Sequence, residues 1–139
     1  MKRIAFLLVL VLLVSCEKGF IEADALGANA DIVGTWVETG YEEDVLLLER
    51  TENLDPSKYG FTIHKDGTFI ERKNTESYTA QSITYDNFEG TWEALSDSLL
   101  NITVGFWGGT MTYQIRIVSL DLENLAIRYL FAEDRAKSR

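Results

Sequence analysis

The sequence predicts an all-β fold, an antiparallel meander of about eight strands that closes into a β-barrel. Two observations predict it. From residue 32 onward, apolar side chains recur at every second position rather than with the period of a helix. Turn residues such as Lys65-Asp66-Gly67 separate the runs by only a few positions, so successive strands are expected to be antiparallel neighbours. Closure is expected because it removes the unpaired edges of a sheet of this size.

Strands are expected where apolar and polar residues alternate and where Val, Ile, Thr and aromatic residues dominate. These ranges are Ile32–Gly40, Val45–Arg50, Tyr59–His64, Thr68–Lys73, Gly90–Leu95, Leu99–Gly105, Thr110–Leu120 and Ala126–Phe131, with a weaker ninth candidate at Ile83–Tyr85. The apolar run at the start of Val45–Arg50 fits either a buried strand or a helical turn. The segment Thr51–Lys58, which contains the only Pro, is expected to be a loop in both cases.

The turn at residues 65–67 also predicts a strand register. If Gly67 takes the left-handed position of a three-residue loop, His64 faces Thr68 and Ile63 faces Phe69. His64 then lies on the outer face of the sheet, where we expect neither a catalytic nor a metal-binding role.

Composition argues against several functional classes. The 139-residue chain has a formal net charge of −9, which opposes nucleic-acid binding because phosphates would be repelled. One Cys excludes an intramolecular disulfide. The only His is expected on the outer face and no Gly-x-Ser-x-Gly motif is present, so a Ser-His-Asp triad is not expected. The acidic run Glu42-Glu43-Asp44 lacks the spacing of a calcium-binding loop. We therefore expect a protein that is not an enzyme and that holds no metal or cofactor.

The N-terminus is typical of a lipoprotein signal peptide over residues 1–15. Lys2-Arg3 precedes an apolar run of 11 residues, Ile4–Val14, which is shorter than the about 20 residues that span a bilayer. The run ends in Leu13-Val14-Ser15-Cys16, which resembles a bacterial lipobox. The resemblance implies cleavage before Cys16 and its acylation, which gives a lipid anchor in the cell envelope. Glu17, which replaces the Asp that retains many lipoproteins in the inner membrane, favours the outer membrane.

These boundaries divide the chain into four parts. After the signal peptide, residues 16–30 are expected to be the lipidated Cys and a tether, since they are rich in small and acidic residues. Residues 31–131 form the predicted barrel domain, and residues 132–139 a polar tail.

The tripeptide Gly34-Thr35-Trp36 recurs as Gly90-Thr91-Trp92. A Gly before a strand lets the backbone bend tightly, and a Trp two residues later can plug one end of a barrel. Over about residues 31–131 the sequence resembles the lipocalin-like domains of small Gram-negative bacterial lipoproteins. The resemblance implies a barrel that binds a small apolar or amphipathic ligand.

Six aromatic residues are the candidates for ligand contacts: Trp36, Trp92, Phe106, Trp107, Tyr113 and Tyr129. For the two Trp residues of the repeat, core packing is the competing interpretation. Phe106 and Trp107 stand beside a glycine turn, which is expected at one rim of the barrel. There they fit either a pocket mouth or a contact with an envelope protein or glycan. The second hypothesis is therefore an envelope interaction module without a small ligand.

Overall fold

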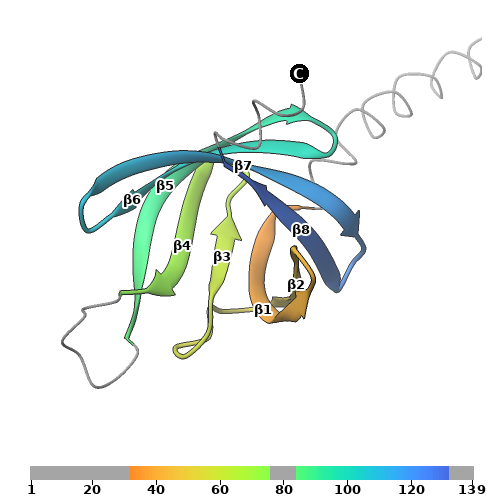
Figure 1. Ribbon diagram of the computed structural model, residues 1–139, viewed down its shortest axis with the longest axis horizontal. Helices are drawn as coiled ribbons and strands as arrows, with labels where there is room; N and C mark the ends of the chain where they lie inside the picture. Colours follow the sequence, from red (N-terminus) through yellow and green to blue (C-terminus); the bar gives the residue numbers. More distant parts are fainter. Residues whose placement is uncertain (1–31, 76–83, 132–139) are drawn as a thin grey trace, which may run out of the picture.

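The computed structural model describes residues 32–75 and 84–131, and within these ranges it is all-β, with eight strands and no helix. The strands are β1 (Gly34–Glu42), β2 (Val45–Thr51), β3 (Gly60–Ile63), β4 (Thr68–Asn74), β5 (Tyr85–Ser96), β6 (Leu99–Phe106), β7 (Gly109–Leu120) and β8 (Asn124–Leu130). Neighbouring strands are antiparallel and close into a barrel around a common interior (Figure 1). The predicted fold class is confirmed. Residues 1–31 and 132–139, which include the predicted signal peptide, Cys16, the predicted tether and the predicted tail, lie outside the described residues.

The strand order differs from a simple meander at the first hairpin. Strands β3 to β8 follow one another around the barrel, but β1 lies between β2 and β3, and β2 pairs with β8. β2 and β3 are not joined by a short turn, because residues 52–59 form a connection long enough to pass β1. Leu54 of this connection packs on the β1–β3 pair, with Cδ2 3.1 Å from the position that a Cβ would take on Gly60.

Two open expectations about strands are now decided. Val45–Thr51 is a strand, so the interpretation of its apolar run as a helical turn was wrong. Tyr85, the end of the weak ninth candidate, is the first residue of the long strand β5, and Ile83 lies outside the described residues. The described part of the chain therefore has eight strands.

The predicted register of the β3–β4 hairpin is confirmed. Ile63 pairs with Phe69, and the His64 amide donates a 3.0 Å hydrogen bond to the Thr68 carbonyl. Gly67 has a φ of 93°, the left-handed conformation that the loop requires. The His64 side chain is exposed, as expected for the outer face.

One end of the barrel, here called the closed end, is filled by Trp36. Its side chain is fully buried, and its indole N–H donates a 2.9 Å hydrogen bond to the Ile32 carbonyl. The Arg50 guanidinium lies over the indole, 4.2 Å from the ring centroid, and donates to the carbonyls of Val33 and Leu122. This end is therefore closed by packing and by satisfied polar groups.

The interior between the two ends is a packed apolar core. Its buried residues are Ile32, Trp36, Leu46, Leu48, Phe61, Ile63, Phe69, Leu100, Ile102, Val104, Tyr113, Ile115, Leu125 and Ile127. Burial of these side chains is the main source of stability for such a domain. A cavity lies toward the end of the barrel opposite Trp36, here called the open end.

Candidate ligand pocket at the open end of the barrel

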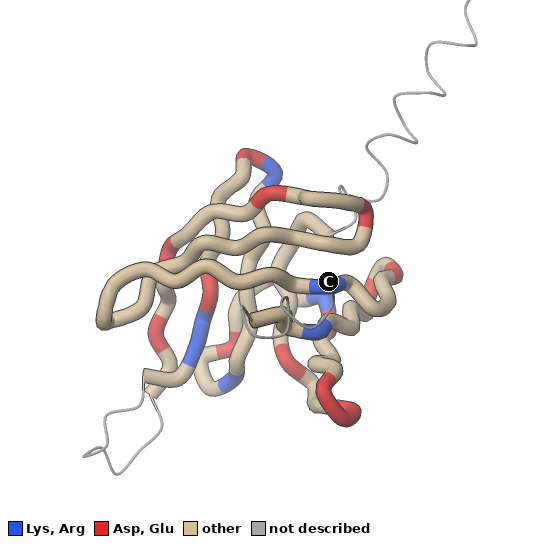
Figure 2. The backbone as a smooth tube through the Cα atoms, turned by 45° about the horizontal axis from the view of Figure 1, so that its top comes forward, with Lys and Arg blue, Asp and Glu red and all other residues tan. Residues whose placement is uncertain are grey.

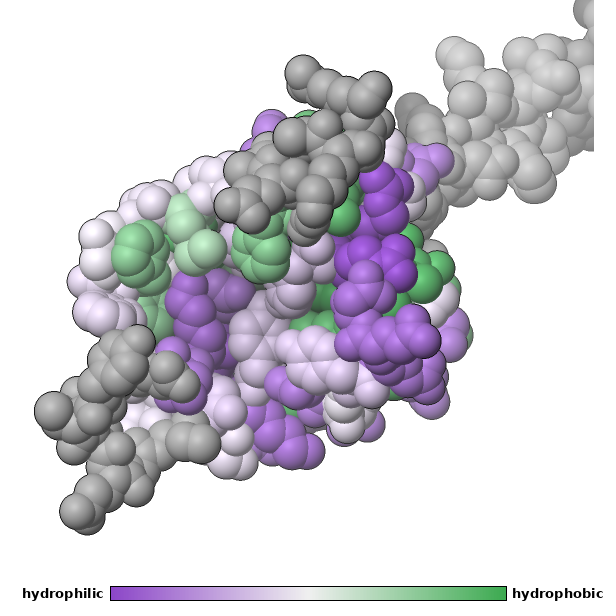
Figure 3. Space-filling model, viewed as in Figure 1, coloured by the Kyte–Doolittle hydropathy of each residue, from purple (hydrophilic) through white to green (hydrophobic). Residues whose placement is uncertain are grey.

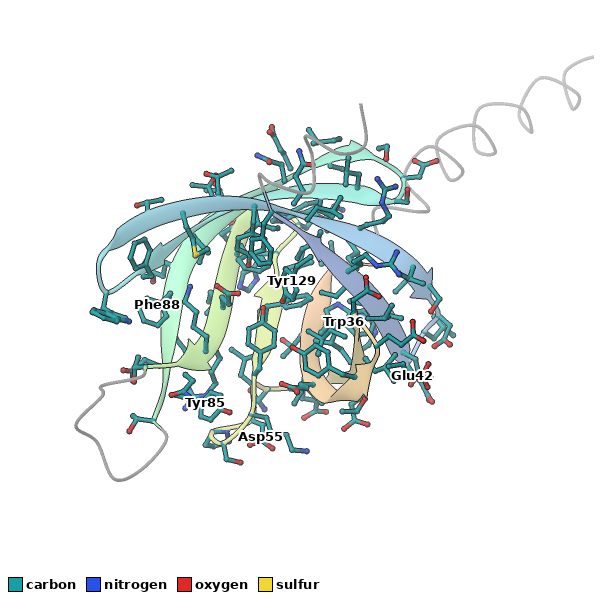
Figure 4. The ribbon with its side chains drawn as sticks, viewed as in Figure 1. Trp36, Glu42, Asp55, Tyr85, Phe88 and Tyr129 are labelled. Atoms are coloured by element: carbon teal, nitrogen blue, oxygen red, sulfur yellow. The ribbon has the colours of Figure 1, made fainter. Side chains whose placement is uncertain are left out.

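A cavity of about 200 Å³ opens at the open end of the barrel. Its wall comprises Tyr41, Tyr59, Glu71, Lys73, Met111, Tyr113, Tyr129 and Phe131. Figure 4 shows Tyr129 between β8 and β3, and Figure 3 shows apolar and hydrophilic residues adjoining on the same face. The pocket therefore combines aromatic walls with one carboxylate and one ammonium group.

Glu71 is the polar centre of the pocket. It is 4% exposed, the one buried charged residue in the described part of the chain. Its Oε1 accepts hydrogen bonds from the Tyr59 hydroxyl at 2.7 Å and the Tyr113 hydroxyl at 2.8 Å, and its Oε2 accepts one from Lys73 Nζ at 2.8 Å. The Tyr59 hydroxyl also contacts the Tyr129 hydroxyl. A buried carboxylate needs such donors, because an unpaired charge in an apolar interior is very costly.

Glu71 and Lys73 face the interior because of strand alternation. Phe69, Glu71 and Lys73 occupy every second position of β4, running from the core to the rim. The Lys73 ammonium forms an ion pair with Glu71 and lies 4.9 Å from the centroid of the Phe88 ring. An ammonium at this place is held by a carboxylate and an aromatic face together.

The phenols of the pocket stay protonated at neutral pH. Burial is the largest cause that raises the pKa of Tyr59, Tyr113 and Tyr129, and the nearby Glu71 charge raises each pKa further. Protonated hydroxyls are the form that donates to the carboxylate, so geometry and electrostatics agree.

A β-bulge brings Tyr41 to the pocket. Trp36 and Glu38 face inward on β1, and the register then shifts between Glu38 and Gly40. Because of this extra residue, Tyr41 rather than Gly40 is opposite the inward Leu46. Burial, and secondarily the Glu38 charge, raise the pKa of Tyr41.

Three aromatic rings form a continuous wall. The centroids of Tyr113 and Tyr129 are 5.5 Å apart in an edge-to-face arrangement, and Phe131 stacks on Tyr129 at 6.1 Å. Phe131 is 52% exposed, so this wall continues from the buried floor to solvent. Such a surface suits the flat, apolar part of a ligand.

The six predicted contact residues separate into three places. Tyr113 and Tyr129 lie together in the pocket. Trp36 fills the closed end, and the Trp92 indole donates a 2.7 Å hydrogen bond to the His64 carbonyl, near the β3–β4 turn. Both Trp residues thus pack away from the pocket, which corresponds to the competing interpretation. The remaining two, Phe106 and Trp107, are at the turn between β6 and β7.

That turn stands beside the pocket mouth. Val104 pairs with Met111, a pocket residue, and the strands continue outward to Phe106 and Gly109. Trp107 at the tip is 75% exposed and Phe106 is 36% exposed. The open end therefore presents aromatic side chains outside the pocket as well as inside it.

Sequence reasoning missed Tyr41, Tyr59, Glu71, Lys73, Met111 and Phe131 as pocket residues. For Glu71 a signal was present, because a charged residue occupies the same face of a strand as the buried Phe69. For Tyr41 the signal was misleading, because alternation from Trp36 without a bulge places Gly40 inside.

A second depression, of about 550 Å³, lies at the closed end and is lined by Glu49, Arg50, Thr51, Glu52, Leu122, Glu123 and Asn124. It has no aromatic wall, and Arg50 is already engaged in closing the barrel. The smaller cavity at the open end is therefore the better candidate, because ligand sites are mostly apolar with a few convergent polar groups.

Other site types find little support in the described ranges. Residues 32–75 and 84–131 contain no group of three or more His, Cys, Asp or Glu side chains placed to hold a metal ion. In the acidic run at the β1–β2 turn, Asp44 forms an ion pair with Arg128, with Oδ2 2.6 Å from Nε. Within the same ranges no helix is long and apolar enough to cross a membrane.

Comparison with known proteins gives no relative from which a role could be transferred. No protein-family model, no curated protein and no solved structure matches this chain.

Proposed function

We propose that this protein is a membrane-anchored, lipocalin-like lipoprotein that binds a small amphipathic ligand in the pocket at the open end of the barrel. The observation that carries the proposal is the pocket, with its wall of Tyr113, Tyr129 and Phe131 and its floor at Glu71. An eight-stranded barrel can hold one small ligand where its own side chains do not fill it, and here that space is the cavity of about 200 Å³ at the open end.

The volume of the pocket limits the size of the ligand that it can hold. Pockets for drug-sized molecules span about 300–1,000 Å³, and an apolar cavity of about 150 Å³ binds benzene. A cavity of about 200 Å³ therefore suits a single ring or a short chain that carries one polar group.

Native mass spectrometry of the full chain, released from membranes in mild detergent, tests this proposal. Met111 lines the pocket at its rim and is 37% exposed, so Met111→Trp should fill the mouth without disturbing the core. The matched control is Val118→Trp, on the same strand but 49% exposed and outside the pocket. Small-molecule adducts that disappear only in Met111→Trp support a pocket ligand, and adducts equally present in both variants contradict it.

Anchoring is proposed from the sequence alone, because Cys16 lies outside the described residues. The support is the order of basic residues, apolar run and lipobox-like ending. Cys16→Ser should release the protein from the membrane fraction or leave the precursor uncut. Unchanged fractionation and processing would refute the anchor.

A second candidate function is an envelope interaction module that binds a protein or glycan through the rim. The specific observation in its favour is Trp107, whose large indole is 75% exposed at the tip of the β6–β7 turn. Crosslinking in intact cells followed by pull-down should then lose a partner in Trp107→Ala. Identical partners for Trp107→Ala and the wild type would reject the rim as a docking surface.

A further inference from the structure

The Glu71 carboxylate has one exchangeable partner. A carboxylate oxygen offers two acceptor sites. Oε1 fills both with the hydroxyls of Tyr59 and Tyr113, which are fixed on the barrel wall. Among the described residues, Oε2 has a single partner, the ammonium group of Lys73.

Lys73 belongs to the rim rather than to the core. Its side chain is 20% exposed, whereas that of Glu71 is 6% exposed. Asp86 is directly opposite Lys73 on β5 and is exposed to solvent, so a second carboxylate is near the rim. Lys73 can therefore turn its ammonium group into water when another ammonium group replaces it at Glu71, because a long, flexible stem carries the charge and the buried carboxylate stays paired.

The place that Lys73 occupies is suited to an ammonium group. It lies between the Glu71 carboxylate and an aromatic face, and the wall formed by Tyr113, Tyr129 and Phe131 continues beside it. Aromatic faces attract cations, more strongly when the site is partly desolvated. Acidic residues are also spread around the barrel (Figure 2), and the net charge of −9 favours the approach of cations.

We propose that the pocket binds small organic cations, namely a primary ammonium group attached to a single aromatic ring or a short apolar chain. The inference rests on the proposed function and names its ligand class. The ligand ammonium takes the place of Lys73 at Glu71 Oε2, and the apolar part lies against the wall of Tyr129 and Phe131. The exchange of one ammonium for another leaves the pocket charge unchanged, whereas an anion would have to lie beside a buried carboxylate.

Three probes of nearly equal size separate charge from shape: benzylamine, which is cationic at neutral pH, benzyl alcohol, which is neutral, and benzoate, which is anionic. We expect calorimetric titration of the full chain in detergent to give an affinity for benzylamine about tenfold above that for benzyl alcohol, with benzoate weakest. Equal or tighter binding of benzyl alcohol or benzoate overturns the cation inference but leaves the ligand pocket standing. Binding of none of the three at millimolar concentration contradicts both.

Removal of the Lys73 ammonium group gives a second test, because the proposal predicts that benzylamine then binds more tightly and not more weakly. Lys73→Met should tighten benzylamine binding by about three- to tenfold, because the ligand no longer displaces a charge from Glu71. Lys65→Met, at the exposed β3–β4 turn of the closed end, is the matched control and should change nothing. Weaker benzylamine binding by folded Lys73→Met overturns the exchange.

If Lys73→Met does not fold, a substitution in the aromatic wall tests the same proposal. Phe131→Leu alters a side chain that is 52% exposed, so the fold should be retained. Benzylamine binding should weaken about threefold or more, because one aromatic face is lost. Unchanged benzylamine binding by Phe131→Leu would contradict the proposed contact between the ligand and the aromatic wall.

Discussion

The hydroxyl of Tyr113 on β7 donates a 2.8 Å hydrogen bond to Oε1 of Glu71 on β4, across the interior of the barrel. Tyr59, the residue before β3, donates to the same oxygen. Strands that do not pair with one another are thus connected through one carboxylate. A satisfied buried network of this kind defines a single arrangement of the pocket floor.

Loss of the Glu71 charge should therefore destabilise the fold. In Glu71→Gln the amide keeps the shape, but its NH₂ group faces the Lys73 ammonium, and the two hydroxyls lose a charged acceptor. We expect a loss of about 1–3 kcal/mol in the free energy of unfolding, measured by urea denaturation. The control is Glu93→Gln on the exposed face of β5, which should stay within about 0.5 kcal/mol. Equal effects of the two variants would show that the buried network adds nothing.

The buried phenols predict a loss of stability at high pH. Burial raises the pKa of Tyr113 above that of the unfolded chain, so the folded state holds the phenolic proton more tightly. The stability linked to this proton is complete below pH 10.0, the ordinary pKa, and is lost as the pH rises above it. Denaturation midpoints measured from about pH 8 to 11 should fall, and should fall less steeply in Tyr113→Phe. Parallel curves for the two proteins would exclude a contribution from this residue.

The lowered pKa of Asp121 predicts that the stability of the fold decreases at low pH. Its carboxylate accepts hydrogen bonds from the amides of Glu123 and Asn124 at 2.8 and 2.7 Å, and these bonds lower its pKa. The stability that the ionised Asp121 carboxylate contributes is present above pH 3.8, its ordinary pKa. It is lost as the pH falls through the lower pKa of the folded state. Asp121→Ala should therefore lower stability at neutral pH and flatten the decline below pH 3.8. A decline as steep as that of the wild type, followed by urea denaturation, would contradict this role.

The two glycines of the first strand provide a matched pair. Gly34 has a φ of +142°, and a Cβ there would lie 2.4 Å from Arg50 Nη1, at the closed end. Gly40 has no atom within 4 Å of its Cβ position. Thermal or chemical denaturation should show a loss of about 1–3 kcal/mol for Gly34→Ala and little change or a small gain for Gly40→Ala. A tolerated Gly34→Ala would mean that the closed end can repack.

Local features of the fold were readable from the sequence. Alternation and the Lys65-Asp66-Gly67 turn predict the β3–β4 register, because a hairpin register depends on residues within a short window. The order of β1, β2 and β3 was not readable, since a connection of eight residues (52–59) permits more than one neighbour.

The two copies of Gly-Thr-Trp contain a glycine for different structural reasons. Gly34 is required for its backbone conformation, whereas at Gly90 a Cβ would lie 2.2 Å from the Thr103 carbonyl oxygen, so that strands β5 and β6 can approach. The sequence marks both glycines but does not reveal the separate causes.

The pocket was only partly predictable, because its residues come from strands that are distant in the sequence. Period 2 places Tyr113 and Tyr129 on inward faces of their own strands. That Tyr113 reaches Glu71, and that Tyr129 reaches the Tyr59 hydroxyl beside it, depends on barrel closure and on contacts between distant strands. The position of Tyr41 in the pocket depends in addition on a one-residue bulge, after which every later side chain of the strand points to the opposite face.

The most direct test of the central claim, that a small ligand enters the open end, is an NMR titration of the full chain in detergent. Benzylamine and benzyl alcohol are added in turn while ring signals of the tyrosines and indole N–H signals of the tryptophans are followed. If a ligand enters the open end, the ring signals of Tyr113 and Tyr129 should shift saturably, and the signal of the Trp36 indole at the closed end should stay unchanged. Shifts confined to the Trp36 end, or no saturable shift at the tyrosines with either compound, would contradict it.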